Sequence, residues 1–374
     1  MFDKLERLVV KIGSSLFVDA QTGQFDRGWL SALCEDIVWL RGRGTSVVIV
    51  SSGAVALGVR ELGLDIGRSR LDEKQAAAAV GQIVLAHAYQ ELLQRHGITT
   101  AQVLLTLDDS ESRRRYLNAS RTLRNLLKRG AVPVVNENDT VATEELRYGD
   151  NDRLAARVAQ MISSECLVLL SDVDGLYTAD PQSDAGARHI AEVAELRAEH
   201  WEMAGGPGST DGSGGMRTKL DAARIAVAAG CRMAITSGHV PHPLRALHDG
   251  ARATWFPASA SPRAARKQWI AGSLGARGAL IVDAGAQRAL GEGRSLLPAG
   301  VTDALGDFDR GDAVRIVTSD GREIGRGLSA YGAHEARLIA GMRSDGIESA
   351  LGYRGRDEII HRDDMVLNVH GNGE

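Results

Sequence analysis

Short apolar runs rich in β-branched residues alternate with longer helical patterns over the first 257 residues, and this alternation constrains the fold most. Several runs are continuously apolar, which is typical of strands covered on both faces. The alternation predicts an α/β fold: a three-layer sandwich around a mainly parallel sheet with right-handed crossovers. The predicted strands lie at 7–13, 45–53, 98–106, 131–138, 166–173 and 231–238, and the clearest predicted helices at 72–97 and 215–230.

After this region the pattern changes. Small residues, proline and charged residues over 258–276 indicate a linker. Helical patterns then become scarce, and short strand-like runs appear at 278–283, 312–330 and 363–370. Asp320-Gly321, between two such runs, is typical of a hairpin turn. We therefore expect two domains, 1–257 and 277–370, of which the second is small and mostly β.

The composition is that of an ordinary globular chain, with 44% hydrophobic and 25% charged residues. Its net charge of −4 gives no global attraction to nucleic acid or to an anionic membrane. The apolar part of "MFDKLERLVVKIG" is too short for a signal peptide or a membrane span. Cys34, Cys166 and Cys231 form no CxxC pair, so we expect buried thiols, no zinc site and a cytoplasmic protein.

Polar residues follow several predicted strands at their carboxyl ends, where ligands gather in an open parallel sheet. A lysine inside an apolar strand, such as Lys11, is costly unless its ammonium reaches a partner or a wet cleft, although a strand-end lysine can also extend to water. Glycine turns there let backbone N–H groups approach an anion. The chain has no GxxxxGK[ST] and no GxGxxG, which disfavours P-loop and Rossmann dinucleotide folds. The residues at these ends are Gly13, Ser14, Ser52, Asp139, Ser171 and Asp172.

The segment "GSTDGSGGMRTKLDAARIA" leads from a glycine-rich run into an apolar-periodic helix. Arg217 and Lys219 lie in the first turns of that helix, where cations oppose the helix dipole. This penalty predicts a compensating anion such as phosphate. The alternative is a basic helix end that is simply solvated.

In "RYGDNDRLAARVAQMI", Asp150, Asn151 and Asp152 stand just before a helical repeat. Such residues cap helices, and they can also grip a polar substrate. Together with the two lysines they suggest phosphoryl transfer, which needs mainly charge neutralisation and alignment. In this hypothesis Lys11 and Lys219 stabilise the transferring group, Asp152 holds them, and Mg²⁺ bridges nucleotide phosphates.

Six motifs occur in one order: "VVKIGSS", "IVSSGAVALG", "VPVVNENDTVAT", "GDNDRLAA", "LLSDVDGLYTADP" and "GSGGMRTKLDAARIA". Their order resembles the amino acid kinase family, in particular its members that phosphorylate glutamate. "NENDTVAT" followed by "GDND" is the strongest discriminator. The last hundred residues, with "FDRGDAVRI", "LGYRG" and "HRDDM", are similar to the PUA domain that many bacterial members carry.

The resemblance implies ATP- and Mg²⁺-dependent phosphorylation of the γ-carboxylate of L-glutamate to L-glutamyl 5-phosphate, the first step of proline biosynthesis. It also implies a homo-oligomer, either a dimer or a tetramer, and feedback inhibition by proline. By position it makes Lys11, Lys219 and Asp152 catalytic, and it makes Ser52, Asp139 and Asn151 glutamate-binding. The implied ATP site consists of Lys11, Gly13, Ser14, Ser171, Asp172, Ser213, Gly214, Gly215, Met216, Arg217, Thr218 and Lys219.

Two alternatives stay open. One is another member of the same fold, acting on aspartate, N-acetylglutamate, uridylate or carbamate. The other is RNA binding, because PUA domains are best known in RNA-modifying proteins. Residues 277–369 contain 12 arginines and no lysine against 15 acidic residues, a net charge of −3, and only three aromatic residues. Since RNA binding usually needs a basic face and often stacking aromatics, we expect a structural or regulatory role for this domain.

Overall fold

The structure is a computed structural model that describes residues 2, 4–18, 25–65, 69–141, 151–204, 215–271 and 276–368, with the side chains of 269 and 271 excepted. It divides into two compact units, Met1–Pro262 and Arg263–Glu374. The strands of the first unit are β1 (Arg7–Ile12), β2 (Ser46–Ser51), β3 (Thr100–Leu105), β4 (Val132–Glu137), β5 (Cys166–Ser171), β6 (Leu176–Tyr177), β7 (His189–Ile190), β8 (Arg232–Ser237) and β9 (Ala253–Phe256). Its helices are α1 (Arg27–Gly42), α2 (Ala54–Leu62), α3 (Leu71–Gln94), α4 (Leu107–Glu111), α5 (Arg113–Lys128), α6 (Asn151–Ile162), α7 (Ala198–Met203), α8 (Met216–Ala228) and α9 (Pro243–His248), with 3-10 turns η1 (Ser14–Leu16) and η2 (Asp139–Val141).

The central sheet of the first unit has the strand order β3-β4-β2-β1-β5-β8-β9. All neighbouring strands are parallel except β8 and β9, which are antiparallel. All six strands predicted in this region are present, within a few residues at each end. The predicted α/β class with a mainly parallel sheet is therefore confirmed.

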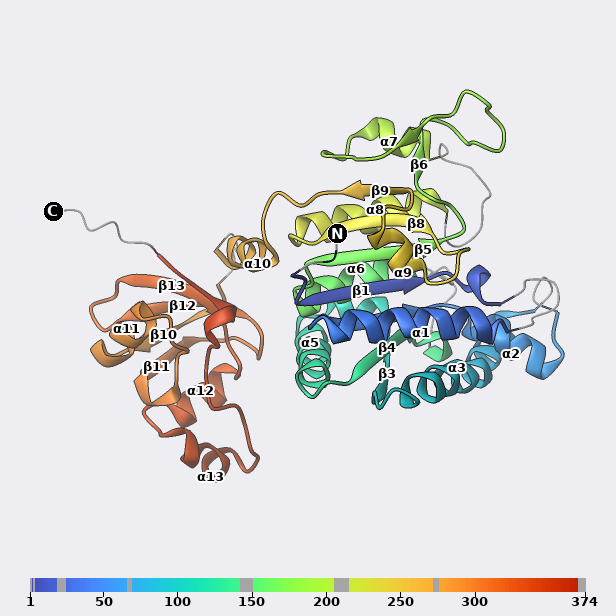
Figure 1. Ribbon diagram of the computed structural model, residues 1–374. Helices are drawn as coiled ribbons and strands as arrows, with labels where there is room; N and C mark the ends of the chain where they lie inside the picture. The colour runs from blue at the N-terminus through green and yellow to red at the C-terminus, as the bar shows by residue number, and fades with distance from the viewer. Residues whose placement is uncertain are drawn as a thin grey trace. The chain divides into compact units, whose positions relative to one another are not determined.

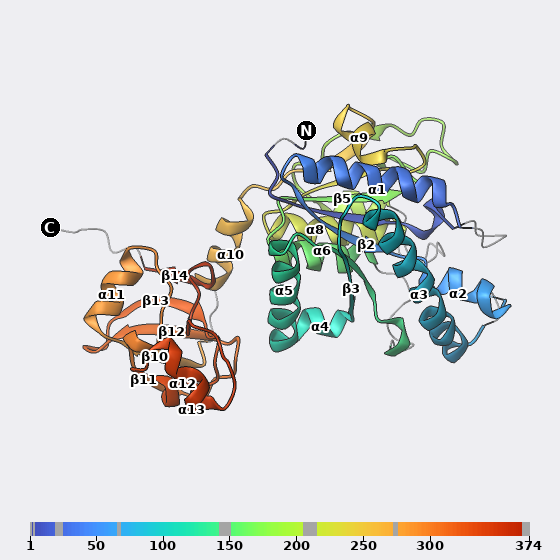
Figure 2. The same ribbon diagram turned by 60° about the horizontal axis from the view of Figure 1, so that its bottom comes forward.

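Helices cover both faces of this sheet, as the two views in Figures 1 and 2 show. Because side chains alternate along a strand, Val10 and Ile12 pack in the core formed with α1, α3 and α9, whereas Val9 packs in the core formed with α5, α6 and α8. Every residue of β4 and β5 is buried, which explains the consecutive apolar residues at 132–135 and 166–170. The sandwich therefore has two apolar cores, one on each side of the sheet.

Helices α2 and α3 cross at unusually close range because glycines lie at the crossing. A Cβ built on Gly58 would lie 1.7 Å from the carbonyl oxygen of Ala77, and one on Gly81 would lie 1.8 Å from that of Ala54. No side chain fits in either place, so the two backbones are in direct contact. This contact fixes the start of α2, at Ala54, against the middle of α3.

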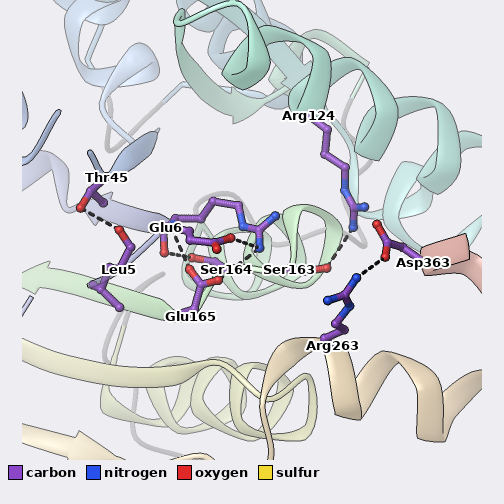
Figure 3. A network of polar contacts seen from close by, with 10 residues as sticks. Leu5, Glu6, Thr45, Arg124, Ser163, Ser164, Glu165, Arg263 and Asp363 are labelled. Carbon is purple, nitrogen blue, oxygen red and sulfur yellow. Dashed lines mark hydrogen bonds and ion pairs between the residues drawn. The ribbon is translucent and has the colours of Figure 1, made fainter. Parts of the chain in front are cut away.

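A polar network fastens the amino ends of several strands (Figure 3). The Thr45 hydroxyl donates to the Leu5 carbonyl at 3.0 Å, and the Ser164 hydroxyl donates to the Arg7 carbonyl at 2.9 Å. Arg124 of α5 donates to the Ser163 hydroxyl at 2.9 Å. These bonds satisfy buried polar groups at the amino edge of the sheet.

The second unit contains a five-stranded sheet of order β11-β10-β12-β13-β14. Its elements are α10 (Pro262–Ala271, whose first residue belongs to the first unit), β10 (Gly278–Val282), α11 (Ala284–Gly291), η3 (Pro298–Gly300), β11 (Val301–Gly306), β12 (Ala313–Thr318), β13 (Glu323–Leu328), α12 (Ala333–Ile339), η4 (Ser344–Gly346), α13 (Ile347–Leu351), η5 (Arg362–Asp364) and β14 (Met365–Leu367). The predicted Asp320-Gly321 turn joins β12 to β13, with Gly321 at a φ of 87°, and is confirmed.

Helix α10 lies inside the segment that was predicted as a linker. Arg266 of this helix pairs with Asp364 at 2.6 Å, and Arg263 pairs with Asp363 at 2.9 Å. The helix is thus tied to η5, within the second unit. The exact boundaries 1–257, 258–276 and 277–370 stay predictions. None of the described helices is both long and apolar enough to cross a membrane.

Candidate active site

A cavity of about 530 Å³ opens where the strands of the large sheet end. The register of the parallel pairs places Ile12 beside Ser51 and Leu170, so the carboxyl ends of β1, β2 and β5 lie level with one another. Ligand sites of open parallel sheets form at this edge. Nine of the predicted site residues line the cavity: Lys11, Gly13, Ser14, Ser52, Asp139, Asn151, Ser171, Asp172 and Lys219.

Lys11 points to the same face of the sheet as Val9, the face covered by α6 and α8. Its ammonium Nζ lies 2.6 Å from Oδ1 of Asp152, in the first turn of α6. The Nζ of Lys219, in the first turn of α8, lies 3.2 Å from Oδ2 of the same carboxylate. The side chains of Lys11, Lys219 and Asp152 are only 7%, 4% and 1% exposed. Two cations that are 208 residues apart in sequence thus meet on one buried carboxylate.

The charge balance of this triad explains how the carboxylate stays ionised. Burial alone would raise the pKa of Asp152, but the two ammonium groups outweigh burial and hold its pKa below the ordinary value. Thr218 also donates to Oδ2 of Asp152 at 3.2 Å. One negative charge between two positive charges leaves a net positive centre at the cavity wall. Such a centre suits a phosphate or a developing phosphoryl charge.

A second group of side chains presents the buried amides of Asn136 and Asn151 and the half-buried hydroxyl of Ser52 to the cavity. Asn151 donates through Nδ2 to Ser52 Oγ at 2.9 Å and to Asn136 Oδ1 at 3.3 Å. Asn136 in turn donates to Gln82 of α3 at 2.7 Å. The Oδ1 of Asn151 is buried and has no hydrogen-bond partner among the described residues. Buried acceptors are nearly always satisfied, so this oxygen is a candidate acceptor for a ligand at this end of the cavity.

Asp139, at the start of η2, adds a carboxylate to this end of the cavity. Burial raises the pKa of Asp139 to about 6. Within the described part of the chain, no cation or hydrogen-bond donor contacts its carboxylate. A ligand ammonium would supply the missing counter-charge.

The opposite end of the cavity is formed by the ends of β1 and β5 and the start of α8. The Ser171 hydroxyl donates to Asp172 Oδ1 at 2.8 Å. Gly215 is the N-cap residue of α8 and Met216 its first residue, whereas Arg217 is exposed to solvent. The free N–H groups of a helix start favour an anion. Three residues of the sequence predictions, Asp150, Ser213 and Gly214, lie outside the described residues.

Asn136 is a functional candidate that the sequence motifs do not predict, although it lies within "VPVVNENDTVAT". Asn136 is 1% exposed and links Asn151 to Gln82. A buried amide at the end of the apolar strand "VPVVNE" was the available signal, because buried polar side chains need specific partners. Among the described residues, no group of three or more His, Cys, Asp or Glu side chains is arranged to hold a metal ion.

Comparison with known families agrees with this geometry. The model of the amino acid kinase family matches residues 6–237, and the model of the PUA domain matches residues 278–351. The chain belongs to the amino acid kinase family. The expected fold, with its C-terminal PUA domain, is therefore confirmed.

Curated relatives within the amino acid kinase family match nearly the whole chain. Glutamate 5-kinase of Paramagnetospirillum magneticum is 63% identical over 362 residues, which are 97% of this chain and 98% of that protein. Glutamate 5-kinase of Rhodospirillum rubrum is 59% identical, over 96% of each chain. Glutamate 5-kinase 1 of Rhizobium meliloti is 57% identical, over 98% of this chain and 93% of its own.

Proposed function

We propose that this chain transfers the γ-phosphoryl group of ATP to the γ-carboxylate of L-glutamate, which gives ADP and L-glutamyl 5-phosphate and begins proline biosynthesis. The observation that carries the proposal is the buried contact of Lys11 and Lys219 with Asp152 at the wall of the cavity. The high identity to glutamate 5-kinases over almost the full length supports the choice of acceptor.

In this reaction a γ-carboxylate oxygen of glutamate attacks the γ-phosphorus, and the bond from that phosphorus to the bridging oxygen of ADP breaks. Lys11 and Lys219 neutralise charge on the equatorial oxygens of the migrating group. Asp152 is a positioning residue that holds both ammonium groups, Lys11 at Oδ1 and Lys219 at Oδ2. The substrate is held by Ser52, Asn151 and Asp139, of which Asp139 faces the α-ammonium and the free Oδ1 of Asn151 accepts a hydrogen bond.

Mg²⁺ fits this site as an ion that arrives with the nucleotide. The described residues offer no cage of three ligands, and Mg²⁺ commonly keeps several waters and binds through substrate phosphates plus one or two carboxylates. Asp172, which lines the cavity beside Ser171, would be the carboxylate that contacts it, directly or through water. When bound, the ion neutralises phosphate charge.

Trapping the acyl phosphate with hydroxylamine tests the function. We expect ATP-dependent hydroxamate formation with L-glutamate, and ADP release at the same rate. Aspartate, N-acetylglutamate, UMP and carbamate, the acceptors of the competing activities, serve as controls for ADP release. Turnover with one of these and none with L-glutamate would reassign the enzyme.

The raised pKa of Asp139 gives a pH-dependent prediction. Below about pH 6 this carboxyl is protonated and loses its attraction for the α-ammonium, whereas above pH 6 it is charged. We expect Asp139→Asn to raise the KM for L-glutamate at pH 8. The ratio of parent to variant kcat/KM should fall toward one as the pH drops from 8 to 5. A ratio that does not change with pH would show that Asp139 does not bind the α-ammonium.

We further propose that proline inhibits the enzyme near the glutamate end of the cavity, since proline carries the same α-amino acid head. Three more proposals follow from the family resemblance and the charge pattern: a cytoplasmic location, a homo-oligomer (a dimer or a tetramer), and a structural or regulatory role for the PUA domain. The net charge of −3 over residues 277–369 supports this role over RNA binding.

A further inference from the structure

A third lysine borders the cavity, and the reaction described above leaves it without a role. Lys74 is the fourth residue of α3, is half-buried, and lines the same cavity as Lys11 and Lys219. Those two lysines share a carboxylate. By contrast, no acidic side chain in the described part of the chain pairs with the Lys74 ammonium. A cation close to a helix start also opposes the helix dipole, so Lys74 gains from an anion that the ligand brings.

The helix places this ammonium at the amino acid end of the site. Lys74, Ala78 and Gln82 follow one another at four-residue spacing, so they lie along one face of α3. Ala78 and Gln82 border a neighbouring hollow of about 260 Å³ together with Asp139, and Asp139 and Lys74 both line the main cavity. One four-residue step along a helix is about 6 Å, so Lys74 lies roughly one turn from Ala78, which borders that hollow together with Asp139.

Asp139 and Lys74 are therefore two opposite charges at one end of the cavity, and neither has a partner among the described residues. An α-amino acid carries the complementary pair, an ammonium and a carboxylate on the same carbon. The nucleotide end is formed by other elements, namely the ends of β1 and β5 and the start of α8. Lys11 and Lys219 are already held on Asp152, and in the proposed reaction they act on the migrating phosphoryl group.

We propose that Lys74 binds the α-carboxylate of the acceptor while Asp139 binds its α-ammonium, so that the pair recognises the zwitterionic head of L-glutamate. This inference depends on the proposed function, because it takes L-glutamate as the acceptor. It assigns Lys74 as a specificity-determining residue that selects an α-amino acid over a simple carboxylic acid. The γ-carboxylate is then left to face the migrating phosphoryl group.

The test compares the parent enzyme with Lys74→Met, which keeps the aliphatic stem and removes the charge. We expect the KM for L-glutamate to rise on the order of tenfold to a hundredfold, as for loss of a charged hydrogen bond. The kcat and the KM for ATP should stay within about threefold of the parent, because the lost contact is made equally in the ground state and the transition state.

Two fragments of the substrate, tested as competitive inhibitors against L-glutamate, show which substrate group loses its contact in the variant. Glutarate lacks the α-ammonium, and 4-aminobutyrate lacks the α-carboxylate. Lys74→Met should weaken inhibition by glutarate by a factor similar to the rise in KM, and it should leave inhibition by 4-aminobutyrate unchanged. Lys74→Arg should recover most of the affinity. Lys128→Met, at an exposed position of α5, should behave as the parent.

A KM for L-glutamate in Lys74→Met within about twofold of the parent would overturn the inference. A selective rise in the KM for ATP would also overturn it, because Lys74 would then serve the nucleotide. Failure of the proposed function has a different signature: the parent itself would show no L-glutamate-dependent release of ADP.

Discussion

Lys219→Ala should lower kcat by about a hundredfold or more, the usual effect of removing one preorganised charge stabiliser. The ammonium of Lys219 is buried and held on Asp152 at 3.2 Å, so no neighbouring water or surface cation can replace it at low cost. The measurement is the initial rate of ADP release at saturating ATP and L-glutamate, compared with hydroxamate formation. We expect the KM for L-glutamate to change far less than kcat.

Two further variants separate the lost charge from lost packing. Lys219→Met retains most of the side-chain volume and should lose as much activity as Lys219→Ala. Lys128→Ala removes an exposed lysine from α5 and should keep parental activity. Near-normal turnover of Lys219→Ala would mean that this ammonium does not act on the migrating phosphoryl group.

Asp152→Asn should damage both activity and stability, because one carboxylate holds two buried cations. Removing the negative partner of a buried ion pair leaves uncompensated charge, and we expect the free energy of unfolding to fall by on the order of 3 kcal/mol. We also expect a kcat loss of about a hundredfold, since Lys11 and Lys219 would no longer be held in place. Denaturant unfolding and steady-state kinetics of the folded fraction measure the two effects separately.

The pH dependence of the free energy of unfolding tests the role of Asp152 in the same variant. The pKa of Asp152 is lower in the folded chain than its ordinary value, so its contribution is fully present above that ordinary value and is lost as the pH falls through the folded pKa. Asp152→Asn should remove this part of the acid sensitivity. Asp221→Asn, a partly exposed carboxylate of α8 that pairs with Arg224 at 3.8 Å, is the matched control. Lost stability with unchanged kinetics would make Asp152 a purely structural residue.

The large sheet could be predicted because its strands are short apolar runs rich in β-branched residues, which differ from the helical patterns between them. β1, β4 and β5 are covered on both faces, so each contains consecutive apolar residues, at 8–10, 132–135 and 166–170. β9, with four residues, and β11, whose burial does not alternate simply, gave no comparable pattern. Short strands such as these form because a neighbouring strand supplies hydrogen bonds. The local sequence does not show which strand will be the neighbour, so it does not predict them.

The site also contains residues that could be predicted from the sequence and residues that could not. Lys11 and Lys219 could be predicted because each places a charge where the local structure disfavours one, inside a strand or at a helix start. Lys74 stands in "LDEKQAAAA", which looks like any solvated helix surface. Its place at the cavity depends on how α3 packs against α2, through the close approach at Gly58 and Gly81. Tertiary packing decides which face of that helix meets the ligand, and sequence spacing does not encode it.

The proposed mechanism requires Lys11 and Lys219 to act together on one migrating phosphoryl group. A crystal structure with ADP, Mg²⁺, L-glutamate and aluminium fluoride, a planar mimic of that group, tests it most directly. We predict both Nζ atoms within hydrogen-bond distance of fluoride atoms, with Asp152 still between the two lysines. A complex in which either lysine points away from the fluoride, while the glutamate γ-carboxylate is in line for transfer, would contradict the account.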